Sequence, residues 1–232
     1  MNFTFGINTN VENKKNLIKV INSIHKLNIP NYEIIIVGNI FIESNKTIII
    51  NFDENIKKSW VTKKKNIITS TAKFENIVYL HDYIIFNKDW YLNFLNFGND
   101  FEICMNQILN KDGTRFRDWT IWPHNGIKID DIVNENKECL LPYHVTNLTK
   151  LMYISGSYWV AKKYFMLNYP LNENLSWGEG EDVEWSKVVR EVTNFQCNSN
   201  SKVILLKYKD PAFKIVSDLT LDKINSTYFH NS

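Results

Sequence analysis

Apolar residues in the first half of the chain follow two spacings in turn, and these predict alternating strands and helices. Short, nearly continuous apolar runs indicate buried strands, and apolar residues three or four positions apart indicate helices. We expect strands at residues 3–7, 32–37, 47–51, 76–80 and 101–107, and helices at residues 11–27, 57–71 and 88–97. This alternation is typical of an open α/β fold, with a mostly parallel central sheet flanked by helices.

The pattern weakens between residues 109 and 150, where turn-forming residues mix with aromatic side chains. A long irregular segment inside a compact domain is usually a binding excursion. After it, the spacing predicts a strand at 152–155, a turn at 156–157, a helix at 159–167 and a strand at 203–206. No repeat, linker or charge block marks a boundary, so we expect a single domain over residues 1–232.

An acidic cluster lies late in the chain, in the run Trp177-Gly178-Glu179-Gly180-Glu181-Asp182-Val183-Glu184-Trp185. Carboxylates this close together raise the pKa of at least one member in a partly dry site, as a general base requires. The next residues place Trp185, Val188, Val189 and Val192 on one helical stripe, so the acids fall in a loop and the first turn of a helix. Acids that stabilise the N-terminus of a helix are the simpler interpretation. The neighbouring glycines and tryptophans nevertheless favour a functional site.

Polar residues follow three of the predicted strands, where ligands of open α/β sheets bind. They are Asn8-Thr9-Asn10, Gly38-Asn39 and His81-Asp82-Tyr83. Each also has a structural interpretation, since an aspartate such as Asp82 often begins a turn. The run Lys63-Lys64-Lys65 is most often a solvated helix face.

Composition limits the partners that the chain can have. A formal net charge of +2, with 22% charged residues, gives no global electrostatic case for binding nucleic acid. The three cysteines are far apart and odd in number, which favours reduced thiols. We find no secretory signal and no apolar run long enough to cross a bilayer, so we expect a cytoplasmic protein without a transmembrane segment. The abundance of Asn, Ile and Lys indicates an AT-rich genome, either bacterial or viral. If the genome is viral, we expect the protein in the cytoplasm of the host.

Taken in order, these motifs resemble the GT-A fold of family-two-type nucleotide-sugar glycosyltransferases. The resemblance runs from about residue 3 to residue 191 and includes Lys65-Asn66 and the turn Ile154-Ser155-Gly156-Ser157. It implies a Rossmann-like sheet in which residues 1–108 bind the nucleotide sugar and residues 109–232 bind the acceptor and supply catalysis. It also implies transfer of a hexose-type sugar from a nucleoside-diphosphate sugar to an acceptor hydroxyl, with inversion.

The resemblance implies roles for individual residues. Asp182 is expected to be the general base, with Glu181 beside it, and Asp82 to be the ligand of a Mn²⁺ or Mg²⁺ ion on the diphosphate. The donor-binding residues are expected to be Asn8, Thr9, Asn10, Gly38, Asn39, Lys65, His81 and Asp82. A glycan or other hydroxyl acceptor is expected near Arg115, Trp119, Trp177, Gly178 and Glu179, together with Trp122 and His124.

Two other functions remain open from the sequence. The family usually has paired acids where this chain has Gly38-Asn39, and two or three carboxylates where it has His81-Asp82-Tyr83. These departures leave a non-catalytic descendant that binds nucleotides or glycans as an alternative. A sugar nucleotidyltransferase is a weaker one, because Gly6-Ile7-Asn8-Thr9-Asn10 is not a glycine-rich phosphate loop.

Overall fold

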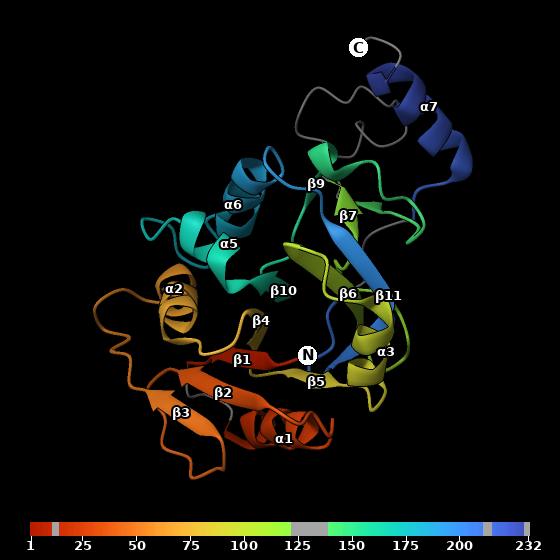
Figure 1. Cartoon of the computed structure of the whole chain (residues 1–232). Helices are drawn as coiled ribbons and strands as arrows, with labels where there is room; N and C mark the ends of the chain where they lie inside the picture. The colour runs from red at the N-terminus through yellow and green to blue at the C-terminus, as the bar shows by residue number, and fades with distance from the viewer. Residues whose placement is uncertain (11–13, 122–138, 211–214, 230–232) are drawn as a thin grey trace.

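A mostly parallel sheet of eight strands forms the centre of the molecule (Figure 1). The computed structural model describes residues 1–10, 14–121, 139–210 and 215–229. In sheet order the strands are β3 (Thr47–Ile50), β2 (Tyr32–Val37), β1 (Phe3–Asn8), β4 (Asn76–His81), β10 (Tyr158–Lys162), β6 (Ile103–Leu109), β11 (Gln196–Leu205) and β5 (Ile84–Phe86). Strand β10 is antiparallel to both of its neighbours and β5 is antiparallel to β11, whereas the other pairs are parallel.

Helices cover both faces of this sheet. The described helices are α1 (Lys14–His25), α2 (Val61–Thr71), α3 (Trp90–Phe97), α5 (Lys163–Asn168), α6 (Glu181–Val189) and α7 (Asp218–Phe229), with a 3₁₀ turn at Thr149–Leu151. Helices α1 and α2 lie on opposite sides of the β1–β2–β3 part, and α5 and α6 lie on the α2 side (Figure 1). A second, small sheet joins β8 (Cys139–Leu140), β7 (Thr120–Ile121) and β9 (Met152–Tyr153).

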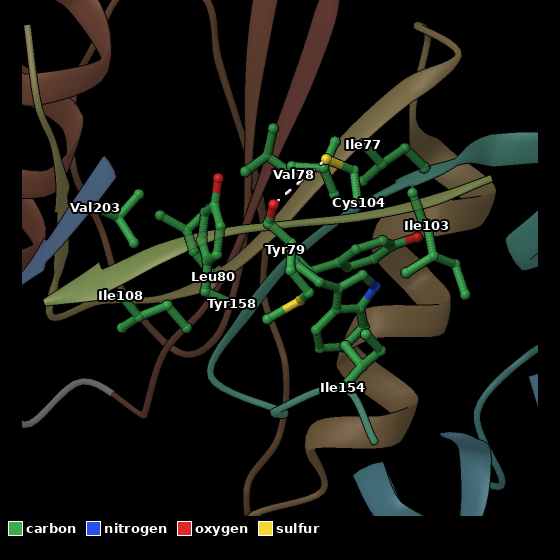
Figure 2. Packing of buried hydrophobic residues seen from close by; sticks show 14 of the residues in the cluster. Ile77, Val78, Tyr79, Leu80, Ile103, Cys104, Ile108, Ile154, Tyr158 and Val203 are labelled. Carbon is green, nitrogen blue, oxygen red and sulfur yellow. Dashed lines mark hydrogen bonds between the residues drawn. The ribbon is translucent and has the colours of Figure 1, made fainter. Parts of the chain in front are cut away.

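A glycine in β1 sets how closely α2 approaches the sheet. A Cβ atom at Gly6 would come within 2.2 Å of the Ile68 Cγ2 atom of α2. On the opposite face, Phe3 and Phe5 pack against the buried Trp90, with ring centroids 5.2 and 5.8 Å apart. Central strands β4, β10, β6 and β11 contribute to the same continuous core (Figure 2).

The predicted helix at residues 159–167 is wrong in its first half. Residues Tyr158–Lys162 form strand β10, and a helix begins only at Lys163. All five residues of β10 are buried, because helices or strands cover both faces of this central strand. A strand buried on both faces has no apolar and polar alternation, so its sequence does not differ from that of a buried helix.

The apolar stripe predicted for the acidic helix is also partly wrong. Trp185 and Val189 are buried, but Val188 is 49% exposed and Val192 is 52% exposed and lies beyond the end of α6. The helix is therefore attached to the core by a narrow face, through Trp185 and Val189.

The other expected elements of the first half occur with ends that differ by a few residues, and the α/β fold class is confirmed. Strand β5 was not predicted, and β11 is longer than residues 203–206. Strands β10 and β11 insert into the sheet of the first half, so one sheet contains strands from both predicted halves of the chain. Among the described helices, none combines the length and the apolar character that a membrane span needs.

A buried carboxylate links the described residues on either side of positions 122–138 to strand β6. Asp118 is 1% exposed and accepts hydrogen bonds from the Trp119 amide at 2.8 Å, the Tyr143 hydroxyl at 2.6 Å and Arg115 Nη2 at 2.7 Å. It also accepts the Ile108 amide of β6 at 3.2 Å. These bonds connect the small sheet to the central one.

We predict that Asp118→Asn destabilises the fold by about 2 to 4 kcal/mol. The amide removes the charge opposite Arg115, and its NH₂ group faces N–H and O–H donors that need an acceptor. Urea unfolding at pH 7 measures the loss. The exposed Asp89→Asn serves as the control and should change stability by less than about 0.5 kcal/mol; equal effects of the two variants would contradict this role of Asp118.

Candidate functional site

The carboxyl ends of four parallel strands meet at one edge of the sheet. In the register of the sheet, Asn8 at the end of β1 pairs with His81 at the end of β4 and with Val37 at the end of β2. Val37 in turn pairs with Ile50, the last residue of β3. The polar residues that follow these strands are therefore neighbours in space.

A cleft of about 320 Å³ opens at this edge. It contains six of the predicted site residues, which are Asn8, Thr9, Asn10, His81, Asp82 and Trp177. It is also lined by Asn16, Ser59, Val61, Lys64, Tyr83, Lys207 and Lys209. The structure thus brings residues 8–10, 81–82 and 177 to one concave surface.

Side chains from β1 and β4 interlock on the floor of the cleft. The Thr9 hydroxyl donates to Asp82 Oδ2 at 2.6 Å, and Asn8 Nδ2 lies 2.9 Å from His81 Nδ1. The His81 ring stacks on Tyr83, with centroids 5.3 Å apart and an interplanar angle of 9°. Burial lowers the pKa of His81 to about 3, with further lowering by Lys65 and Lys209. The imidazole is therefore neutral at pH 7, and Nδ1 can accept the amide proton.

Gly38 and Asn39 are absent from the described lining of the cleft. A Cβ atom at Gly38 would lie 2.5 Å from the Thr9 carbonyl oxygen, so only glycine lets the loop after β1 pass this close. Asn39 is exposed. The structure therefore places Gly38 where it shapes the Thr9 loop.

The backbone of Gly156 connects the two sequence regions of the site. Because β10 is antiparallel to β4, the turn before β10 lies beside the end of β4. The Gly156 amide donates to Asp182 Oδ2 at 2.8 Å, and the Gly156 carbonyl accepts Lys65 Nζ at 2.7 Å. The Gly156 backbone also lies close to His81 and raises its pKa. A Cβ atom at position 156 would approach Asp182 Oδ2 to 3.1 Å.

The acidic loop turns sharply before α6. Gly178 and Gly180 have φ angles of 85° and 76°, which favour glycine. Glu179 accepts the Ser176 amide at 2.6 Å and so closes the turn. Glu181 is 5% exposed, and burial, with Asp182 beside it, raises the pKa of its carboxyl group. The raised pKa expected of the acidic cluster is thus found at Glu181.

Helix α2 holds the backbone of the acidic loop. Trp60 Nε1 donates to the Glu173 carbonyl at 2.6 Å, and the Thr62 hydroxyl donates to the Leu175 carbonyl at 2.7 Å. The Trp177 amide donates to the Ser59 carbonyl at 3.1 Å. These bonds place the Trp177 indole, which is 63% exposed, at the cleft.

The prediction of a solvated face for the lysine run is wrong for two of its three members. Lys64 and Lys65 are buried. Lys64 Nζ donates to the Thr9 carbonyl at 2.9 Å and pairs with Glu54. Lys65 lies over the Trp159 ring, with Nζ 4.3 Å from its centroid, and burial lowers its pKa to about 8. Lys65 is absent from the described lining of the cleft.

Two cationic residues of the cleft were missed from the sequence. Lys207 and Lys209 follow β11, and the rule that ligands bind at the carboxyl ends of strands could have found them. Burial lowers the pKa of Lys209, and the charges of Lys207 and Arg117 lower it further. Within the described chain, neither lysine forms a salt bridge with a carboxylate. Two positive charges that lie close together without a carboxylate partner among the described residues favour the binding of an anionic ligand.

Two residues expected at an acceptor site have structural partners instead. Trp119 is fully buried and its Nε1 donates to the Val145 carbonyl at 2.8 Å, so stacking of a sugar on Trp119 does not fit this placement. Arg115 is occupied by Asp118 and stacks on Tyr143, with 3.9 Å from Cζ to the ring centroid. Trp122 and His124 lie outside the described residues.

Metal ligands are sparse in the part of the chain that the structure describes. No group of three or more His, Cys, Asp or Glu residues there could hold a metal ion. Among the described residues that line the cleft, Asp82 is the only one with a carboxylate. A divalent cation would need oxygen ligands from a bound molecule in addition to Asp82.

Comparison with known proteins identifies the fold. No protein-family model and no curated protein matches the chain. GalNAc-T7, solved with UDP, GalNAc and Mn²⁺, matches with a TM-score of 0.65 at 13% identity, over 92% of this chain and 45% of that one. S. aureus TarS 1-349 in complex with UDP-GlcNAc matches with a TM-score of 0.61 at 13% identity, over 94% of this chain and 62% of that one. The chain thus spans less than two thirds of either structure, and its fold is that of the GT-A glycosyltransferases.

We predict that the stability of the wild type depends on the titration of Lys65. A pKa of about 8 in the folded protein, against 10.5 unfolded, corresponds to a cost on the order of 3 kcal/mol for the charged form. The unfolded chain binds more protons between these two values, so stability should rise with pH over this window. Lys65→Met should lack that rise and gain most relative to the wild type near pH 7. Parallel stability curves for the two proteins, measured by urea unfolding from pH 7 to 10, would contradict the prediction.

Proposed function

We propose that this protein is a glycosyltransferase that moves a hexose-type sugar from a nucleoside-diphosphate sugar to an acceptor hydroxyl. One observation carries the proposal: the cleft at the strand ends and the acidic turn of α6 are joined through the Gly156 backbone. The fold supports it, since structures of this fold contain UDP or UDP-GlcNAc.

The charges of the cleft suit the diphosphate of such a donor. Lys207 and Lys209 would face the phosphate oxygens, whereas Lys64, which also lines the cleft, is paired with Glu54. As the sugar leaves, negative charge builds up on the diphosphate, and fixed cations stabilise it in the transition state. Asn8, Thr9 and Asn10 would contact the nucleotide from the loop after β1.

A divalent cation would fit beside this diphosphate. Asp82 would be its protein ligand, and the Thr9 hydroxyl already fixes the orientation of the Asp82 carboxylate. Oxygen atoms of the diphosphate would complete the coordination, as is usual for Mg²⁺. When bound, Mn²⁺ or Mg²⁺ would act as a Lewis acid on the leaving group.

Asp182 is the residue that we assign as general base. Its two carboxylate oxygens accept different amides, Oδ2 that of Gly156 and Oδ1 that of Val183 at 2.9 Å, and this fixes the plane of the group. The acceptor oxygen would attack the anomeric carbon, its proton would pass to Asp182, and the bond to the diphosphate would break. Attack from the face opposite the diphosphate inverts the configuration. Trp177, with Gly178 and Glu179 beside it, would offer the acceptor an exposed aromatic face.

We predict that Asp182→Asn lowers transfer by about a hundredfold or more, because an amide takes up no proton. The amide oxygen can still accept the Gly156 N–H group, so donor affinity should stay within about twofold. Release of nucleoside diphosphate from a panel of nucleotide sugars, with and without Mn²⁺, measures the rate, and calorimetry measures donor binding. Near wild-type transfer by the variant would remove Asp182 from the mechanism.

The exposed Glu191→Gln is a matched control and should transfer at the wild-type rate. The same panel separates the alternative functions. Pyrophosphate release would indicate a nucleotidyltransferase, and donor binding without turnover of any donor would indicate a non-catalytic binding protein.

We also predict that Lys207→Gln combined with Lys209→Gln weakens donor binding by at least about tenfold, since each lost contact to a phosphate removes roughly 1 kcal/mol or more. The loss should be smaller for the nucleoside without phosphates, which lacks the anionic group. Lys19→Gln on α1, combined with Lys26→Gln just after this helix, removes the same charge from exposed positions and should leave the affinity unchanged. Equal losses for nucleoside and donor would contradict a phosphate role.

A further inference from the structure

We propose that Lys65 is a positioning residue for the Glu181–Asp182 acid pair, and not a ligand of the donor diphosphate. This proposal rests on the proposed function, because it states that Lys65 positions the general base of the proposed transfer reaction. It departs from the role that the resemblance implies, which places Lys65 at the diphosphate.

The ammonium group of Lys65 is enclosed by the protein. Lys65 is 1% exposed, and its Nζ donates to the Gly156 carbonyl at 2.7 Å. The charge lies over Trp159, which stacks on Tyr79 at 4.8 Å and lies 5.6 Å from Trp185 of α6. Lys65 is absent from the lining of the cleft, which contains Lys64, Lys207 and Lys209 instead.

The second step is mechanical. Lys65 holds the carbonyl of Gly156, and the amide of the same residue holds Asp182 Oδ2. The turn is therefore fixed between an ammonium group on α2 and a carboxylate on α6. Loss of the lysine would free the carbonyl, and with it the orientation of the N–H group that positions the base.

The third step is electrostatic. Glu181 is buried next to Asp182, and two adjacent carboxylates repel each other in a partly dry site. Lys65 attracts both of them and lowers the pKa of Glu181 against the effect of burial. His81 also faces Lys65, from β4, and is neutral, and Lys64 on the same helix is paired with Glu54. Lys65 thus supplies positive charge that offsets part of the effect of burial on the Glu181 carboxyl group.

A structural role predicts a different outcome from a functional one. Burial of a lysine is costly, and Met has nearly the same length without the charge. If Lys65 served only to fill the core, Lys65→Met would improve stability and leave the reaction unchanged. If it positions the base, the variant would fold well and react slowly.

The experiment compares Lys65→Met with Lys162→Met. Lys162 is a matched control at the opposite end of β10: it is 6% exposed, lies over the Phe101 ring at 4.4 Å, and donates to Asn76 and Asn99 at 2.8 Å each. We expect Lys65→Met to lower kcat by about tenfold to a hundredfold, with donor affinity within about twofold. Lys162→Met should keep the wild-type kcat. Lys65→Gln, which can still donate to Gly156 without the charge, should fall between the wild type and Lys65→Met.

A second readout does not depend on turnover. The carboxyl carbon of Glu181 is titrated by NMR in the wild type and both methionine variants. In Lys65→Met the titration of Glu181 should move to higher pH by about one pH unit, and in Lys162→Met it should not move. An unmoved titration overturns the proposal, even if the wild type transfers no sugar and the proposed function fails. Weakened donor binding with unchanged kcat would also overturn it, by placing Lys65 on the diphosphate.

Discussion

The site depends on one geometric constraint, which is that the backbone of Gly156 lies between two helices and a strand end. Parallel strands bring only their carboxyl ends to the ligand edge of the sheet. Strand β10 runs the opposite way, so it brings the turn at its beginning to that edge. This turn meets Lys65 from α2, Asp182 from α6 and His81 from β4. A Cβ atom at position 156 would lie 3.1 Å from Asp182 Oδ2, so a larger residue there would press on the carboxylate that the turn positions.

The charges divide into two groups on either side of this turn. The cleft contains Lys64, Lys207 and Lys209 with a single carboxylate, Asp82, whereas the α6 side contains two adjacent acids with the buried Lys65. A transfer reaction of the proposed kind needs this separation, because the leaving group requires positive charge and the base must not be neutralised by it.

Much of the fold and the position of the cleft could be predicted from the sequence. The wrong predictions concern residues whose surroundings come from other parts of the chain. Strands β1, β2 and β4 have short apolar runs followed by polar residues, so both their positions and the ligand edge were predictable. Strand β10 was not, because burial on both faces removes the alternation that marks a strand. The burial of Lys64 and Lys65 depends on Thr9, Glu54, Gly156 and Trp159, which are distant in sequence. Trp119 and Arg115 were assigned to a surface because their partners Val145 and Asp118 could not be paired with them from spacing.

The same dependence on distant contacts explains why the acidic loop suits recognition of an acceptor. Its backbone is held by Trp60, Thr62 and Ser59, which bond to main-chain groups of the loop and of the residues just before it. The side chain of Trp177 takes no part in these bonds and stays largely exposed. A fixed backbone with an exposed indole has little conformational entropy to lose when a sugar face stacks on it. Since Asp182 lies five residues further on, at the start of α6, the loop that would bind the acceptor also sets the distance from the acceptor to the base.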